Sequence, residues 1–90
     1  MNYFNAKKRA RDGKKVRSEL MPKDAYVVHE PAGFSLQAED IWNKHNQAQA
    51  VKSGGSLVVL PYYIYFDGKS IQMGLDTLQQ RVIESNWMEI

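Results

Sequence analysis

The sequence contains no cysteine, which excludes disulfide bonds, a thiolate zinc site and a cysteine nucleophile, and which fits a reducing compartment. Its longest apolar run, residues 57–66, is too short to cross a bilayer and contains Pro61. The basic N-terminal segment lacks the continuous apolar stretch of a secretory signal. We therefore expect a soluble protein that does not bind membranes.

The sequence also lacks the common catalytic motifs. It has no Walker loop, no Rossmann glycine fingerprint and no Gly-x-Ser-x-Gly elbow. His29 and His45 are far apart in the sequence, and neither has a carboxylate at a metal-ligand spacing. These patterns predict no catalytic residue, no metal and no cofactor, so an enzyme is disfavoured.

Composition predicts a folded chain. Ninety residues with 43% hydrophobic and 11% aromatic content are typical of one small globular domain, here residues 1–90. A domain of this size often gains stability by joining copies of itself. The predicted fold class is α+β, with a mostly antiparallel sheet, an N-terminal helix and a C-terminal helix.

Local signals predict the order of the elements. Gly13 ends a first helix, Asp67–Gly68 turns a late hairpin, and Thr77–Gln80 fits a capping box. The expected elements are a helix over 3–12, strands over 14–20 and 25–29, a loop and short helix within 35–53, strands over 56–67 and 70–75, a helix from the capping box to about residue 86, and a last strand over 87–90.

The net charge is only +2, yet seven Lys and Arg residues lie between positions 7 and 17, with Asp12 as the only acid among them. Beside Tyr3 and Phe4, these cations can hold phosphates while an aromatic ring stacks on a base. A solvated helix face explains them equally well. Acids elsewhere in the chain argue against a broad nucleic-acid surface, so a small anionic metabolite is the favoured partner.

The segment Trp42–Asn46 places one aromatic and several hydrogen-bonding side chains together in a stretch that is predicted to be irregular. Asn43 and His45 can contact a base or ribose, or they can be structural. Asn46 is expected to cap the helix that starts at Gln47, and Trp42 is either a ligand contact or a core residue.

In their order and spacing, these pieces are similar to the phage Thoeris anti-defence family, second type. The resemblance covers nearly the whole chain. Its most specific parts are the Trp42–Asn46 segment and the spacing from Gly74 to Trp87. It also includes Phe4, the basic helix with Gly13–Arg17, the strand Val59–Tyr62, Asp67–Gly68, Met73–Gly74 and Gln79.

The resemblance implies a sponge that binds a nucleotide immune signal, such as glycocyclic ADP-ribose, and denies it to the host effector without degrading it. It also implies a homo-oligomer, typically a tetramer, with pockets between subunits, that acts in the cytoplasm of the infected bacterial host. An alternative is a module that binds nucleic acid or a host protein through the basic helix. A third class, hydrolysis of the signal, is less favoured.

The chain departs from the family where ligand choice is decided. The family has tryptophans where this chain has Leu20–Pro22 and Leu75, and acidic residues where it has Arg81 and Asn86. The resemblance therefore implies a more basic, less aromatic pocket and a different nucleotide signal, with Arg81 either in the pocket or on a helix surface. The candidate ligand-binding residues are Phe4, Arg17, Met21, Asn43, His45, Leu75, Gln79 and Arg81.

Overall fold

The computed structural model describes residues 1–31 and 33–90. These residues form a small α+β fold with three α-helices, one 3₁₀ turn and seven strands that pair in antiparallel fashion. The predicted fold class is therefore confirmed. Contacts divide the described chain into two compact units, one of residues 1–31 and 62–90 and one of residues 33–61, and each is described by itself.

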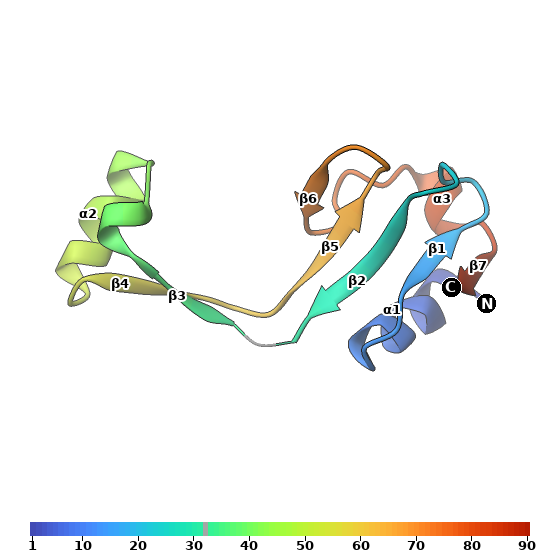
Figure 1. Cartoon of the computed structure of the whole chain (residues 1–90), viewed down its shortest axis with the longest axis horizontal. Helices are drawn as coiled ribbons and strands as arrows, with labels where there is room; N and C mark the ends of the chain where they lie inside the picture. Colours follow the sequence, from blue (N-terminus) through green and yellow to red (C-terminus); the bar gives the residue numbers. More distant parts are fainter. Residues whose placement is uncertain (32) are drawn as a thin grey trace. The chain divides into compact units, whose positions relative to one another are not determined.

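The first unit is built on a five-stranded sheet with the strand order β6-β5-β2-β1-β7 (Figure 1). Two helices, α1 (Tyr3–Arg11) and α3 (Gln80–Ile83), belong to the same unit. The strands are β1 (Val16–Ser18), β2 (Tyr26–Glu30), β5 (Tyr62–Phe66), β6 (Ile71–Met73) and β7 (Trp87–Glu89).

The core of this unit lies where α1 contacts β1, β2 and β7. Ala6 and Ala10 of α1 are fully buried, and their small side chains let the helix approach the sheet closely. Trp87 is buried beside them, with its ring centroid 5.3 Å from that of Tyr3. The Trp87 Nε1–H donates a hydrogen bond of 3.1 Å to the carbonyl oxygen of Val82, so the buried indole is satisfied and ties β7 to α3.

Several predicted elements are confirmed in this unit. Gly13 follows α1 with a φ of 91°, as expected of a glycine that ends a helix. Val16 of β1 pairs with Val27 of β2 in the early hairpin. The turn between β5 and β6 contains Asp67 and Gly68, where the Asp67 carboxylate accepts hydrogen bonds from backbone amides of the turn. The last strand is β7.

The second unit contains β3 (Phe34–Gln37), the 3₁₀ turn η1 (Ala38–Asp40), α2 (Lys44–Lys52) and β4 (Ser56–Val59). Strands β3 and β4 form a two-stranded antiparallel sheet, and α2 contacts η1 and β4. Ile41 and Ala50 are its buried hydrophobic residues. Gly54 and Gly55 follow α2 with φ values of 100° and 113°, as expected of glycines that end a helix.

Three predictions about elements are wrong. The single strand over 56–67 is two strands in different sheets, because Leu60–Pro61 interrupts it and proline lacks the amide that a sheet needs. Strand β3 lies in the segment that was expected to be a loop. Thr77 does not cap α3; its hydroxyl bonds the Gln72 carboxamide instead, and α3 is a single turn that begins at Gln80.

No helix formed by the described residues combines the length and the apolar character that a membrane span requires.

Candidate ligand-binding site

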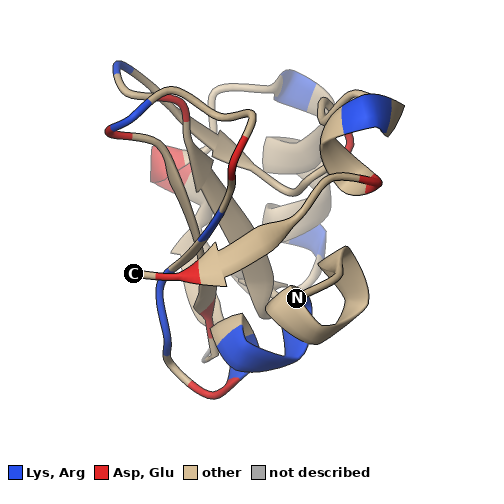
Figure 2. Ribbon diagram, turned by 90° about the vertical axis from the view of Figure 1, so that its right-hand side faces the viewer, with Lys and Arg blue, Asp and Glu red and all other residues tan. Residues whose placement is uncertain are grey.

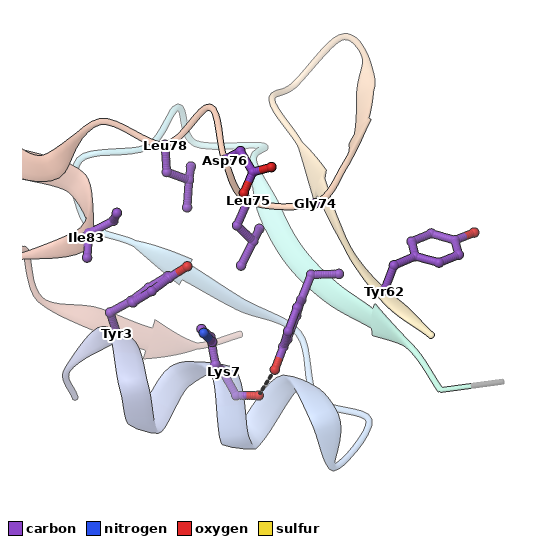
Figure 3. Close-up of a pocket in the computed structure, with 9 residues that line it drawn as sticks. Tyr3, Lys7, Tyr62, Gly74, Leu75, Asp76, Leu78 and Ile83 are labelled. Carbon is purple, nitrogen blue, oxygen red and sulfur yellow. Dashed lines mark hydrogen bonds between the residues drawn. The ribbon is translucent and has the colours of Figure 1, made fainter. Parts of the chain in front are cut away.

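Two pockets in the first unit share one lining residue, Leu78. The larger, of about 490 Å³, is called here the aromatic pocket (Figure 3). The smaller, of about 220 Å³, is called the arginine pocket. The walls of the aromatic pocket include Tyr3, Lys7, Tyr63, Leu75, Asp76 and Leu78. Those of the arginine pocket include Met21, Tyr65, Leu78, Gln79, Arg81 and Val82.

The aromatic pocket contains an ammonium group next to two tyrosine rings. The Nζ atom of Lys7 lies 5.1 Å from the ring centroid of Tyr3 and 5.7 Å from that of Tyr63. The Tyr63 hydroxyl donates a hydrogen bond of 3.4 Å to the carbonyl oxygen of Lys7, which ties β5 to α1 across the pocket (Figure 3). Cation–π attraction therefore holds a positive charge in an apolar wall, where it can meet an anionic group.

The Tyr3 hydroxyl shares this pocket with two groups that oppose its ionisation. Burial raises the pKa of Tyr3 above its ordinary value, and the nearby Tyr63 and Asp76 raise it further. Tyr3 is therefore a neutral phenol at physiological pH. It can donate a hydrogen bond to a ligand and present its ring face for stacking.

The arginine pocket contains a guanidinium group hydrogen-bonded to a carboxamide. Arg81 Nε donates a hydrogen bond of 2.9 Å to Gln79 Oε1, which fixes the guanidinium beside the carboxamide. Among the described residues that line this pocket there is no Asp or Glu to neutralise Arg81. Guanidinium groups bind phosphate in a bidentate manner, so the pocket is suited to an anion.

Arg17 is hydrogen-bonded to the wall of the arginine pocket. Its Nη2 atom donates to the carbonyl oxygens of Met21 and Pro22 at 2.7 and 3.1 Å, and both of these residues line the pocket. The Nε atom of Arg17 is buried and has no hydrogen-bond partner among the described residues. Arg17 thus holds the loop between β1 and β2 in position while keeping one donor unused.

The structure brings part of the predicted site together. Met21, Gln79 and Arg81 line the arginine pocket, with Arg17 bonded to its wall, and Leu75 lines the aromatic pocket. The loop after β1, which contains Met21, therefore lies next to the segment before β7, which contains Gln79 and Arg81. Arg81 lines the arginine pocket and is at the same time an exposed residue of α3.

The other predicted residues line neither pocket. Phe4 is 61% exposed on α1, and the Nζ atom of Lys8 lies 4.6 Å from its ring centroid. Asn43 is the N-cap of α2, because its side-chain oxygen accepts hydrogen bonds from the backbone amides of His45 and Asn46. The helix thus begins earlier than predicted, and Asn46 is not the cap.

Trp42 and His45 also belong to the second unit. Trp42 is 96% exposed, so the interpretation of this residue as core is wrong. His45 is an exposed residue in the first turn of α2. Both pockets are lined by residues of the first unit.

Sequence reasoning missed Lys7, Tyr63 and Asp76 as pocket residues. A partial signal existed for the first, because Tyr3 and Lys7 are one helical turn apart and therefore share a face of α1. Asp76 had no signal, since it lies in an irregular segment between β6 and α3.

No family model matches the chain, and no curated protein matches it. Among the described residues, no group of three or more His, Cys, Asp and Glu side chains is placed to hold a metal ion.

Proposed function

We propose that the protein is a phage anti-defence sponge that binds a nucleotide-derived immune signal, glycocyclic ADP-ribose or a related cyclic nucleotide, and keeps it from the host effector without degrading it. The observation that carries the proposal is the arginine pocket, where Arg81 and Gln79 stand beside Met21. Met21 is distant from the other two residues in the sequence, and all three were expected to meet in a ligand site.

The chemistry of both pockets suits this class of ligand. Arg81 can hold a phosphate, Gln79 can bond a hydroxyl or a base edge, and Tyr3 and Tyr63 offer ring faces for stacking. A sponge needs slow release more than turnover, and groups that are fixed before binding slow the release of a ligand. Two such groups are held by hydrogen bonds without a ligand: the loop after β1, bonded by Arg17, and the guanidinium of Arg81, bonded to Gln79.

The proposal includes a homo-oligomer, with a tetramer favoured. The second unit contains about thirty residues, fewer than usually form a stable core without metals, disulfides or association. It exposes four large apolar side chains, Trp42, Val51, Val58 and Leu60, each at 64% or more. A second copy of the chain would cover part of this surface. Light scattering should report a mass above the monomer, and Val58→Ser with Leu60→Ser should lower it.

The decisive test is a capture assay. The purified protein is incubated with cyclic ADP-ribose isomers and cyclic di- and trinucleotides, separated by filtration, and then heated to release what it holds. Depletion of one compound with intact recovery supports the sponge. Recovery of an altered compound would make the protein an enzyme, and no depletion of any compound would contradict the proposal.

A second function is favoured by one observation, the exposed pair of Phe4 and Lys8 on α1 outside both pockets. Lys and Arg residues gather along this helix (Figure 2). Among them, Arg9 forms an ion pair of 2.7 Å with Glu89 of β7. This face can contact an oligonucleotide or an acidic host protein. Salt-dependent binding to oligonucleotides that is lost in a variant lacking the charges of Lys7, Lys8 and Arg9 would support it.

A further inference from the structure

The aromatic pocket carries two opposite charges on different elements. Lys7 extends from α1, while Asp76 lies on the segment between β6 and α3, on the other side of the pocket (Figure 3). The distances from Lys7 Nζ to the Tyr3 and Tyr63 rings place the ammonium among aromatic faces. A pocket for a phosphate alone would need only the cation, so the carboxylate calls for an explanation.

The carboxylate of Asp76 has no hydrogen bond or ion pair with another described residue. It does lie close enough to the Tyr3 hydroxyl to oppose its ionisation and raise its pKa. Asp76 and Tyr3 line the same pocket, and the carboxylate offers unused acceptor atoms there. In a site for an anionic ligand it would repel phosphate, and its favourable partners are neutral donors.

A ribonucleotide supplies such donors in its sugar. The two adjacent hydroxyls of ribose can donate together to one carboxylate, an arrangement that nucleotide-binding proteins use elsewhere. We infer that the aromatic pocket is the nucleoside half of the site, in which Asp76 accepts hydrogen bonds from the ribose hydroxyls while Tyr3 and Tyr63 contact the base.

This assignment gives each remaining group a role. The ammonium of Lys7 meets the phosphate nearest the sugar, and the arginine pocket, which shares Leu78 with the aromatic pocket, takes a phosphate further along the ligand. The inference rests on the proposed function and adds that Asp76 selects ribose over deoxyribose.

The test uses ADP and 2′-deoxy-ADP as probes, titrated calorimetrically into the full-length protein. The wild-type protein should bind ADP about fivefold more tightly than 2′-deoxy-ADP, a modest ratio because Asp76 is partly screened by solvent. In Asp76→Ala this ratio should fall to about one. The matched control Asp24→Ala removes an exposed acid that lines neither pocket, and it should keep the ratio of the wild type.

The ratio is the informative quantity, because removing Asp76 also relieves repulsion of the phosphates and can raise the affinity for both probes. Equal binding of the probes by the wild type, or an unchanged ratio in Asp76→Ala, would overturn the inference. A loss of discrimination between ADP and IDP in Asp76→Ala, with the ribose ratio intact, would assign the carboxylate to the base and overturn it as well.

Failure of the inference is separable from failure of the proposed function. If the capture assay retains a cyclic nucleotide but ADP does not bind at millimolar concentration, the nucleoside assignment is wrong while the sponge stands. If the capture assay retains nothing, the proposed function fails whatever ADP does.

Discussion

The guanidinium of Arg17 on β1 donates a hydrogen bond of 2.7 Å to the carbonyl oxygen of Met21. This contact joins a strand to the loop that follows it, and that loop forms one wall of the arginine pocket. Arg17 was expected to touch the ligand directly. In the structure its Nη2 atom donates to the protein backbone, so its main effect on binding is exerted through the shape of the pocket.

Arg17→Ala should weaken both the fold and ligand capture. The variant leaves the carbonyl oxygen of Met21 without the donor that Arg17 supplies, while that of Pro22 keeps only its bond from the Ala25 amide. The free energy of unfolding should fall by about 1 to 3 kcal/mol. Urea denaturation measures this change, with Lys14→Ala as a control that removes an exposed charge near the same strand. Reduced capture with unchanged stability would instead make Arg17 a direct ligand contact.

Arg81→Ala should weaken ligand capture without weakening the fold. Its side chain is exposed, and its described hydrogen bond is to the exposed Gln79, so stability should change by less than about 0.5 kcal/mol. Affinity for the captured signal should fall at least about tenfold, because a phosphate loses a charge-assisted hydrogen bond. The control is Arg11→Ala, an exposed arginine at the end of α1 outside both pockets. Equal affinities for the two variants would remove Arg81 from the site.

Local sequence signals predicted the parts of the fold that local chemistry decides. The helix before Gly13 and the turn at Asp67–Gly68 follow from backbone preferences within a few residues. Strand β3 was missed because its stability depends on pairing with β4, from which it is separated by η1 and α2. The apolar run around Leu60 resembles one long strand in composition, and Pro61 divides it because proline has no amide hydrogen to donate.

The candidate site was predicted only in part, because half of it is formed by elements that are distant in the sequence. A resemblance in order and spacing led to Met21, Gln79 and Arg81, which the fold does bring together. The aromatic pocket depends on α1, β5 and the segment after β6 meeting in space, and no periodicity along the chain encodes that meeting. Asp76 could therefore be recognised only in the folded chain.

The turn at Asp67 should make stability depend on pH at the acidic end. Hydrogen bonds from the Ser70 and Lys69 backbone amides and from the Ser70 hydroxyl lower the pKa of Asp67 below its ordinary value of 3.8. The folded state therefore favours the ionised carboxylate, and the stabilisation is present above the unfolded pKa and lost as pH falls through the lower folded pKa. Urea midpoints measured below about pH 4 should fall less steeply in Asp67→Asn than in the wild type. Parallel profiles would contradict this role of the turn.

The phenol of Tyr3 provides a separate readout of the aromatic pocket. Because Asp76 contributes to the raised pKa of Tyr3, Asp76→Ala should lower that pKa towards its ordinary value of 10.0 without restoring it fully, since burial is the larger cause. Absorbance of the phenolate during an alkaline titration measures the shift, and Tyr3→Phe identifies the signal. An unchanged Tyr3 titration in Asp76→Ala would contradict the contribution of Asp76 to this pKa.

Gly33 is required by a close approach of two backbone segments in the second unit. A Cβ atom at this position would lie 2.1 Å from the carbonyl oxygen of Val59, well inside contact distance. Gly33→Ala must therefore push β3 away from β4 at the end where Phe34 pairs with Val59. The expected loss of stability in this unit is more than about 2 kcal/mol.

Hydrogen exchange resolved by residue provides the measurement for Gly33→Ala. Amides of β3 and β4 should exchange much faster, while those of β2 and β5 in the first unit should keep most of their protection. Ser35→Ala is the matched control, because it changes an exposed side chain on the same strand without crowding the backbone. Uniform loss of protection in both units would show that they unfold as one cooperative body, and unchanged exchange would show that the strands separate at little cost.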